Sequence, residues 1–514
     1  MRRLRTKEKI GLHPVVVLLL LCLIIIIISG IFHFFNVQTT FNKVVPATNS
    51  FQVTSESVTS LFSLRGLKYI FTSTVKNFAN YAVLSNLIII LIGIGVMVKS
   101  GFLKSAFLLV SKKAKKTTVT YILVLLCILA SIIGNLSYII LIPISALLFL
   151  YGKRNPMIGI VASYAALTCG SALSFFITSV DSSLLTYTLN NAYIFNNVYV
   201  ISPFSYLLVM PILIVILSVL ITNIVENTVA KRLPKYDFSE EEMAEEEFVV
   251  TRKIRRGLVL SLLVGIVYLL IFIYNIIPGL PLSGNLLDYT QTLYIDKLFS
   301  VNSFFNTGFV FVVAVLFILL GLSYGIGAKT IQNNKEFVEA MGAELNGIGK
   351  VLVMIFVASV FINIFKHSNI GNVVLGSFTN LISNASFAGL PLLLLLFIFS
   401  MISSLMVPSA ANSWMILSGV VPTFMQANIT PEFTQLVFRL GSSVAIGITP
   451  VFAYFIVYLA YLEKYNQDAK PITLKSAIRY QLPFVLITAI VYVLFIILWY
   501  IVGFPLGIGA RIAL

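Results

Sequence analysis

Two charged residues lie within apolar segments of the sequence, where a charge is costly and therefore marks a candidate site. Arg439 lies in the apolar segment 433–462, just before Gly441, where we expect the helix to be interrupted. Asp181 ends a similar segment that we expect to be interrupted at Gly170. A guanidinium group at such a break can bind a substrate carboxylate through two hydrogen bonds, and an aspartate can bind a cation or relay a proton. The alternatives are that Arg439 snorkels or pairs with a carbonyl group, and that Asp181 is solvated at the outer end of its helix.

Trp414 and a set of neutral oxygen donors are the other candidates. Trp414, one of two tryptophans, can stack on an aromatic substrate, although packing in the core is the alternative. Neutral oxygens suit Na⁺ or the polar head group of a substrate, whereas the alternative role is to cap broken turns of the backbone. The expected ion-binding positions are Asn135, Ser131, Gly170, Ser174, Ser409, Asn412 and Thr449.

The sequence carries no pattern typical of a zinc centre, a cofactor site or an enzyme. Its three cysteines, Cys22, Cys127 and Cys169, lie within apolar segments and lack the spacing of metal ligands. No HExxH motif and no paired carboxylate motif is present. We therefore expect neither enzymatic activity nor a cofactor, and the only bound ions expected are coupling ions, Na⁺ or H⁺.

The composition is typical of a membrane protein. Hydrophobic residues make up 59% of the 514-residue chain and charged residues only 11%, whereas soluble domains carry about 25% charge. So few charges cannot cover a water-exposed surface, and most of the exterior must face lipid. The net charge of +16 comes from basic residues between apolar segments. This distribution follows the positive-inside rule and does not indicate nucleic-acid binding.

About nine apolar segments are predicted to cross the membrane as helices. They cover residues 15–35, 81–98, 157–188, 205–224, 257–277, 305–324, 351–365, 433–462 and 482–502. Basic residues precede the first segment, and no small-residue cleavage site follows it, so we expect a retained helix with a cytoplasmic N-terminus in the cell membrane. These basic residues are Arg2, Arg3, Arg5, Lys7 and Lys9. Residues 36–80 are expected to form an outer loop with one surface helix.

Two further apolar segments, 119–151 and 390–425, are too long for one span and too short for two. Lys116 and Arg154 flank the first segment, so both of its ends are expected in the cytoplasm. A re-entrant hairpin that turns at Gly134 satisfies both constraints, and the second segment is expected to form a similar hairpin from the outside. Backbone that leaves a helix at that depth must be buried in protein or line a wet cavity.

The two halves of the chain contain a related pattern. Gly170 and Thr178 have the same spacing as Gly441 and Thr449, although chance agreement among small and apolar residues is the alternative. The positive-inside assignment gives the two halves opposite orientations, which is typical of inverted-repeat secondary transporters. Helix ends at the two breaks would expose free N–H and C=O groups to a shared central cavity.

Three sections follow from this pattern. The first inverted repeat covers residues 1–225, with its hairpin on the cytoplasmic side, and the second covers 304–514, with its hairpin on the outer side. Residues 226–303 between them form a charged cytoplasmic linker, the spare helix at 257–277 and an outer loop. The linker includes the acidic run Glu240, Glu241, Glu242, Glu245, Glu246 and Glu247.

These features resemble the AbgT family of p-aminobenzoyl-glutamate transporters over nearly the whole chain. The blocks that carry the resemblance include Gly93-Ile94-Gly95-Val96, Tyr138-Ile139-Ile140-Leu141-Ile142-Pro143, Pro431-Glu432, Arg439-Leu440-Gly441 and Ile448-Thr449-Pro450. The resemblance implies an all-α homodimer whose protomers each have nine transmembrane helices and two hairpins. It also implies ion-coupled transport of folate-related aromatic amino-acid conjugates, and some members are exporters of sulfonamides. The positions that match the family's substrate site are Asp181, Trp414, Pro431, Arg439 and Pro450. Ser442 is added to them as a sixth candidate substrate-binding position.

Several positions depart from the family pattern, because polar or ionisable residues have been replaced. Ser442 and Asn135 stand where the pattern has aspartates. Ala411 replaces a serine, and Ser174 and Ile446 replace asparagines. A site with fewer carboxylates holds Na⁺ more weakly and offers fewer proton carriers. The sequence therefore leaves both the coupling ion and the substrate open.

We predict a secondary transporter of p-aminobenzoyl-glutamate or a related aromatic carboxylate that works by ion-coupled alternating access. The alternative within transport is a proton-driven exporter of sulfonamides or p-aminobenzoate. A channel is disfavoured, because the scarce intramembrane charge does not form a continuous polar pore.

Overall fold

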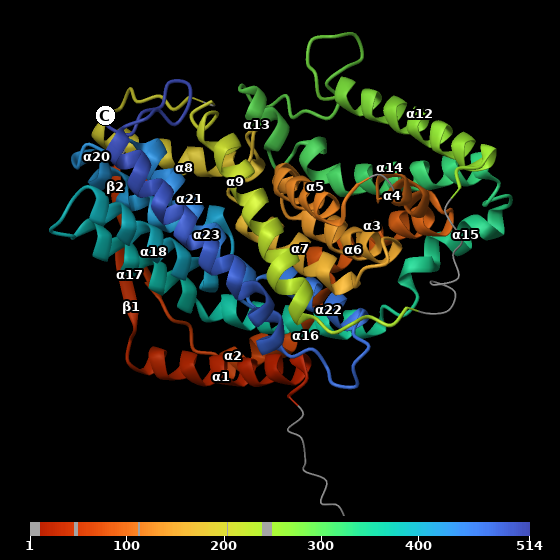
Figure 1. The fold of residues 1–514 in the computed structure, drawn as a ribbon. Helices are drawn as coiled ribbons and strands as arrows, with labels where there is room; N and C mark the ends of the chain where they lie inside the picture. The colour runs from red at the N-terminus through yellow and green to blue at the C-terminus, as the bar shows by residue number, and fades with distance from the viewer. Residues whose placement is uncertain (1–10, 46–49, 112–113, 203, 239–248) are drawn as a thin grey trace, which may run out of the picture.

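The computed structural model describes residues 11–45, 50–111, 114–202, 204–238 and 249–514. Within these ranges the chain is mostly helical (Figure 1), as we predicted from the apolar segments. The basic residues at 2–9 and the acidic run at 240–247 lie outside the described residues.

The first half of the chain begins with one long helix and a pair of strands, and continues in helices. Its elements are α1 (Pro14–Phe34), β1 (Gln38–Val45), β2 (Ser50–Ser57), α2 (Leu64–Ala79), α3 (Ala82–Lys99), α4 (Phe102–Ser111), α5 (Lys116–Leu129), η1 (Ala130–Ile133), α6 (Leu136–Tyr151), α7 (Pro156–Cys169), α8 (Ser179–Phe195), α9 (Val209–Ile224), the π-helical turn η2 (Val225–Val229) and α10 (Ala230–Arg232).

The second half consists of helices joined by loops within its described residues. Its elements are α12 (Arg252–Tyr274), α13 (Tyr294–Phe299), α14 (Phe304–Ala328), α15 (Asn334–Gly342), η3 (Ala343–Leu345), α16 (Gly349–Ser368), α17 (Ile370–Ser383), α18 (Leu390–Met406), α19 (Ala410–Leu417), η4 (Ser418–Val420), α20 (Val421–Gln426), α21 (Pro431–Ala445), η5 (Ile446–Ile448), α22 (Ala453–Lys464) and α23 (Leu474–Val502).

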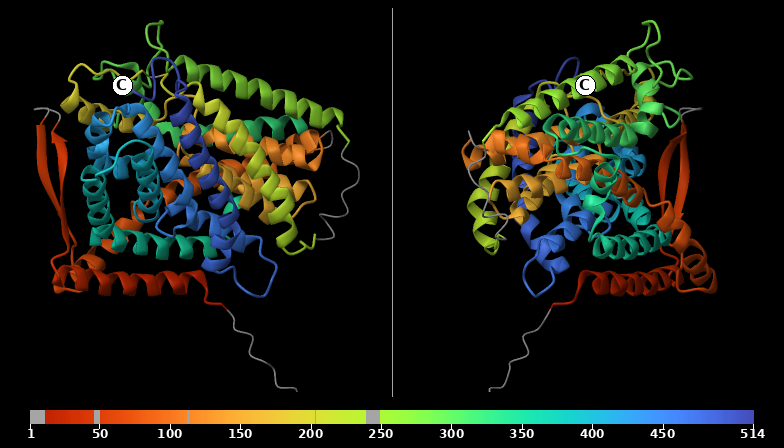
Figure 2. Two further views of the ribbon diagram at one scale, coloured as in Figure 1. Left: turned by 60° about the vertical axis from the view of Figure 1, so that its left-hand side comes forward. Right: turned by 90° about the vertical axis from the view of Figure 1, so that its right-hand side faces the viewer.

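The antiparallel ribbon of β1 and β2 is the exception to the all-helical prediction. It occupies the predicted outer loop, and Figure 2 shows it standing at the edge of the helical body, with α1 lying across one end. The ribbon is fixed on α17, where the Asn380 side chain donates a hydrogen bond to the Thr40 carbonyl oxygen at 2.5 Å and Phe41 is buried. The Ser- and Thr-rich composition of this region predicted a loop, but threonine is also favoured in strands.

Nine helical stretches within the described ranges are long and apolar enough to cross a membrane, which is the number that we predicted. Eight coincide with predicted crossings. The ninth is Lys116–Ile133, which we had predicted as one limb of a hairpin. The predicted crossing at 157–188 is instead divided between α7, of 14 residues, and α8, of 17 residues, because the chain leaves the helix between them.

The first predicted hairpin folds back on itself. The helix ends in η1, and the chain turns at Gly134, whose φ of 58° lies in the left-handed region that favours glycine. Arg154 Nη1 donates a hydrogen bond to the Lys116 carbonyl oxygen at 3.3 Å, so the two ends of the segment are in contact. Arg154 also pairs with Glu226 at 2.7 Å, which anchors both ends to η2. That the segment enters and leaves the bilayer on one side stays a prediction.

Cysteine labelling tests this prediction. Lys116→Cys and Lys153→Cys are both expected to react with an impermeant maleimide from the cytoplasmic side only, because the segment between them returns to its starting side. Ser55→Cys, in the ribbon, is the control that should react only from outside. The native cysteines are all buried and contribute little background. Labelling of the two lysine positions from opposite sides would turn the segment into an ordinary span.

The second half contains one break where we predicted it and one elsewhere. Residues 407–409 separate α18 from α19, as expected for the second hairpin. The predicted helix break at Gly441 is wrong, because α21 continues to Ala445 and the chain leaves the helix at 446–452. A Cβ atom on Gly441 would lie 2.6 Å from the Phe397 carbonyl oxygen of α18. The glycine therefore permits close helix packing and does not interrupt the helix.

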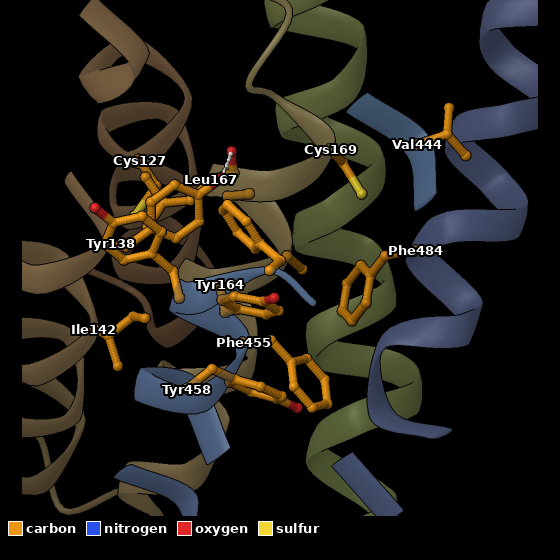
Figure 3. Packing of buried hydrophobic residues seen from close by; sticks show 14 of the residues in the cluster. Cys127, Tyr138, Ile142, Tyr164, Leu167, Cys169, Val444, Phe455, Tyr458 and Phe484 are labelled. Carbon is orange, nitrogen blue, oxygen red and sulfur yellow. Dashed lines mark hydrogen bonds between the residues drawn. The ribbon is translucent and has the colours of Figure 1, made fainter. Parts of the chain in front are cut away.

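Stacked aromatic side chains join the two halves (Figure 3). The Tyr164 ring of α7 stacks on the Tyr458 ring of α22 with centroids 4.2 Å apart. Tyr138 of α6 stacks on Tyr454, with centroids 5.0 Å apart, and its hydroxyl donates to the Leu167 carbonyl oxygen at 3.0 Å. These contacts hold the elements around the chain breaks in one core. The inverted orientation of the two halves and the division into three sections stay predictions.

Candidate substrate-binding site

A cavity of about 120 Å³ lies where both predicted hairpins and both interrupted helices meet. Its walls include polar backbone from the chain breaks, one cation and small side chains. The lining residues are Ser131, Gly134, Asn135, Ser137, Tyr138, Leu167, Ser171, Thr178, Val180, Ser404, Val407, Pro408, Ser409, Ala410, Ala411, Arg439, Ser442 and Ile446. Segments far apart in the sequence thus converge on one site, as the predicted shared cavity requires.

Arg439 supplies the positive charge of the cavity. Its Nε donates a hydrogen bond to Asp181 Oδ1 at 3.3 Å, and both side chains are largely buried. Within the described part of the chain, its two Nη groups have no protein partner. A guanidinium group has five N–H donors, so these groups are available to a ligand. The sequence predicted both residues but not their pairing.

Asp181 is held by the start of α8. Its Oδ2 accepts hydrogen bonds from the Thr178 backbone N–H at 3.0 Å and the Thr178 hydroxyl at 2.7 Å. The Asp181 N–H donates back to Thr178 Oγ1 at 3.2 Å, which completes a capping box. Asp181 therefore caps a helix with one oxygen and orients Arg439 with the other. Asp181 lies beside the chain break that follows Gly170, and it pairs with Arg439, which is neither of the roles that we considered for it.

Two hydroxyl groups tie the hairpins to the interrupted helices. Ser131 Oγ donates to the Leu173 carbonyl oxygen at 2.5 Å, which joins the first turn to the break between α7 and α8. Thr449 Oγ1 donates to the Leu405 carbonyl oxygen at 2.6 Å, which joins the end of α18 to the break after η5. Both side chains satisfy backbone groups that the breaks leave free. They thus act as caps, one of the two roles that we considered.

Most of the other predicted ion-binding positions also cap broken turns. Gly170 follows the last residue of α7, and Ser174 Oγ donates to the Phe176 carbonyl oxygen at 2.7 Å. Ser409 Oγ accepts a hydrogen bond from the Asn412 N–H at the start of α19. Asn135 differs from these, because it lies at the border between two cavities.

The second cavity, of about 540 Å³, adjoins the first. Asn135 and the turn at 407–409 line both cavities and therefore form the partition between them. Lys366 at the end of α16 and Asn412 line the larger cavity only. The arrangement provides a wider space directly beside the Arg439 pocket.

Trp414 is not at the cavity wall. Its side chain is fully buried, its ring stacks on Phe438 with centroids 4.5 Å apart, and its Nε1 donates to Thr188 Oγ1 at 2.8 Å. Thr188 in turn bonds Gln435 at 2.5 Å. This network joins α8, α19 and α21, which is the packing alternative for Trp414. Tyr138 is the aromatic residue that lines the cavity.

Of the three remaining predicted substrate-binding positions, only Ser442 lines the cavity. Pro431 is buried at the first turn of α21 and lies away from the cavity lining, and Pro450 lies in the break before α22. Ser442 lines the cavity, but its hydroxyl donates to the Arg439 carbonyl oxygen at 3.0 Å, within the helix. The two prolines therefore shape the ends of helices, and Ser442 is the member of this group placed to meet a ligand.

Glu432 is a buried residue whose own role the sequence analysis missed. It is 2% exposed, and its Oε2 accepts a hydrogen bond from the Tyr199 hydroxyl at 2.8 Å. Burial, and then the neighbouring Glu432 carboxyl group, raises the pKa of Tyr199, so this phenol keeps its proton and donates. Glu432 lies directly before the predicted apolar segment 433–462, so the rule that marks charges within apolar segments did not apply to it until the structure placed it inside α21.

Comparison with known proteins now identifies the family. A model of the AbgT transporter family matches residues 3–514. The chain belongs to the AbgT family. Its members are transporters, so the AbgT fold and the membrane location follow for this chain.

Two AbgT relatives show how far the similarity extends. The p-aminobenzoyl-glutamate transport protein of Escherichia coli (strain K12) is 25% identical over 466 residues, which are 90% of this chain and 89% of the relative. MtrF of Neisseria gonorrhoeae, whose structure was described as illuminating a class of antimetabolite efflux pumps, is 27% identical. The MtrF match covers 98% of both chains with a TM-score of 0.50. The AbgT chain is thus similar along its whole length to a transport protein and to an efflux pump.

Proposed function

We propose that this AbgT transporter carries p-aminobenzoyl-glutamate or a related aromatic carboxylate by ion-coupled alternating access. The observation that supports the proposal most directly is the cavity in which the free Nη groups of Arg439 lie between the chain breaks. A guanidinium group presents paired donors that match the two oxygens of a carboxylate. The similarity to the Escherichia coli transport protein supports the same substrate class.

The cavity offers complementary partners to both parts of such a substrate. The substrate carboxylate would bind the Nη groups of Arg439, while Asp181 keeps the Nε side of the guanidinium group in place. Its aromatic ring would lie against Tyr138, and its polar groups would meet Ser442 and Asn135. Opening of the partition formed by Asn135 and residues 407–409 would connect this pocket with the larger cavity.

A second function is export of sulfonamides or p-aminobenzoate driven by protons. The similarity to MtrF, a pump of the antimetabolite efflux class, favours it. The same pocket serves both functions, because the direction of a coupled carrier follows the net gradient of its substrates. We propose in either case a homodimer in the cell membrane with the N-terminus in the cytoplasm. Light scattering of the detergent-solubilised protein tests the dimer, with a mass of one protomer as the contradicting result.

Transport by purified protein in proteoliposomes tests the function. Labelled p-aminobenzoyl-glutamate is expected to accumulate above equilibrium when a Na⁺ gradient or a pH gradient is imposed separately. Empty liposomes and liposomes without a gradient are the controls. In parallel, cells that express the protein are assayed for sulfonamide accumulation. Lower sulfonamide accumulation without p-aminobenzoyl-glutamate uptake would favour export, and the absence of both activities would contradict the proposal.

A further inference from the structure

Glu432 occupies an unusual position for a carboxyl group. It lies in the first turn of α21, on the same helix as Arg439, and is 2% exposed. Its side chain accepts a hydrogen bond from the Tyr199 hydroxyl at 2.8 Å, and its carbonyl oxygen accepts one from the Tyr206 hydroxyl at 3.0 Å. Both donors come from the chain between α8 and α9, so this carboxyl group lies at an internal contact between the two halves.

No cation pairs with Glu432 within the described ranges of the chain. The ion pairs found there join Arg154 to Glu226, Arg439 to Asp181 and Lys464 to Glu344. A carboxylate without a cation is costly in a buried site, and a bound proton removes that cost. Two features favour the charged carboxylate instead. The Tyr199 hydroxyl donates to the charged oxygen, and the N-terminus of α21 favours a negative charge. These opposing effects are what a group needs in order to take up and release a proton.

A small cavity lies beside Asp181 and beside Tyr206, whose hydroxyl is bonded to the Glu432 backbone. Its volume is about 40 Å³, and Asp181, Tyr206 and Gln435 are among its lining residues. A polar cavity needs roughly 10–15 Å³ to hold a water molecule. The cavity therefore has room for water between Asp181 and Tyr206, whose hydroxyl is bonded to the Glu432 backbone.

Few titratable groups bond Glu432 directly. Tyr199 donates to its carboxyl group and Tyr206 to its backbone carbonyl oxygen. Asp181, the partner of Arg439, lines the small cavity that Tyr206 also lines. Of the other helices packed on α21, α18 and α20 contribute no titratable side chain. The other titratable or charged groups on elements packed against α21 are Tyr164 and Cys169 of α7, Tyr187 and Tyr193 of α8, Lys475, Arg479, Tyr480, Tyr492 and Tyr500 of α23, and Arg511 of the C-terminal segment that bonds Thr430. Among these groups, Glu432 is the carboxyl group that has no cation partner in the described ranges.

We propose that Glu432 is the binding site for the coupling proton of this transporter. This inference rests on the proposed ion-coupled transport and specifies H⁺ as the ion. In one state the carboxylate takes up a proton on a side-chain oxygen and becomes a neutral acid. In the opposite state the O–H bond breaks, the proton leaves to water, and the Tyr199 hydroxyl stabilises the carboxylate that remains. No oxidant or co-reactant takes part.

Glu432→Gln tests the proposal in proteoliposomes that contain the full-length protein. The variant keeps the shape of the side chain and an oxygen that accepts from Tyr199, but it cannot bind a proton. We expect a pH gradient to drive no accumulation of labelled p-aminobenzoyl-glutamate above equilibrium. Exchange of labelled for unlabelled substrate, which needs no net proton movement, should continue. Glu339→Gln, at an exposed position of α15, is the matched control and should behave like the wild type.

Three results of this experiment would overturn the proposal. The first is equal pH-driven accumulation in wild type and Glu432→Gln. The second is loss of both exchange and accumulation in Glu432→Gln. The third is accumulation by the wild type when a Na⁺ gradient alone is imposed. Tyr199→Phe provides a second variant with an intact carboxyl group. Loss of its hydroxyl removes a donor to the carboxylate, so the pH profile of driven uptake should move to higher pH. An unchanged profile would also count against Glu432.

A measurement without substrate separates this inference from the proposed function. Infrared difference spectra of the protein in lipid, recorded between low and high pH, should contain a carboxylic-acid band that Glu432→Gln lacks. The same band in both proteins would contradict the inference even if transport is observed. Conversely, a wild-type protein that has the band but transports no p-aminobenzoyl-glutamate would leave the proton site standing and contradict the proposed substrate.

Discussion

Arg439→Ala is expected to abolish uptake of p-aminobenzoyl-glutamate, and Arg439→Lys to raise the KM at least about tenfold. The alanine variant removes the cation of the cavity and leaves Asp181 without its partner. Lysine keeps the positive charge beside Asp181 but loses the planar, paired donors that match a carboxylate. A hydrogen bond to a charged group contributes about 1.5–3 kcal/mol, and each 1.4 kcal/mol corresponds to about a factor of ten in affinity. The measurement is initial uptake rate against substrate concentration in proteoliposomes.

Two controls separate substrate binding from folding for Arg439. Arg65→Lys, at an exposed position of α2, makes the same chemical change outside the cavity and should leave uptake as in the wild type. The double variant Asp181→Asn with Arg439→Gln removes both charges, so no unpaired charge remains buried. It should elute as a folded protein and still fail to transport. Wild-type uptake by Arg439→Ala would remove Arg439 from the substrate site.

Trp414→Ala is expected to destabilise the protein by about 3–5 kcal/mol, the range for truncation of a buried aromatic side chain. Its side chain is fully buried between α8 and α21, where it stacks on Phe438 and donates to Thr188. Removal leaves a cavity and takes away the donor to the Thr188 hydroxyl oxygen. Thermal unfolding in detergent should therefore show a large decrease in the midpoint temperature.

Trp414→Phe is the matched control for that prediction. Phenylalanine keeps a ring against Phe438 but loses the hydrogen bond to Thr188 and part of the buried ring volume, so we expect a loss of about 1–2 kcal/mol, smaller than for alanine. Wild-type stability in both variants together with loss of substrate binding would support direct substrate contact, the other role that the sequence suggested for Trp414. The packing seen in the structure predicts the reverse.

Much of the helical scaffold could be predicted, because the thickness of a bilayer limits the length of each apolar segment. The breaks at Gly134, Gly170 and near Pro408 followed from that limit together with residues that disfavour helices. Gly441 misled the prediction, since its lack of a Cβ atom serves packing against α18. Glycine thus permits a turn at Gly134 and close helix packing at Gly441, and the local sequence does not distinguish these two roles.

The candidate site was predicted in part. Arg439 and Asp181 were recognisable because charge is rare in apolar segments, but their 3.3 Å contact depends on the packing of α8 against α21. The assignment of Trp414 to packing likewise needed its neighbours, Phe438 and Thr188. Glu432 was missed because it lies one residue before the predicted segment 433–462, whereas α21 begins at Pro431. The substrate class came from the family resemblance and not from the chemistry of single residues.

The central claim is that the cavity lined by Arg439 and the chain breaks holds the substrate. Photoaffinity labelling with a p-azidobenzoyl-glutamate, followed by mass spectrometry of the labelled peptides, tests this claim most directly. The account predicts adducts in residues 131–138 or 407–411 that unlabelled p-aminobenzoyl-glutamate suppresses and that Arg439→Ala lacks. Competed adducts found instead in the apolar groove between α1 and α2, which Phe34 and Phe62 help to line, would contradict it.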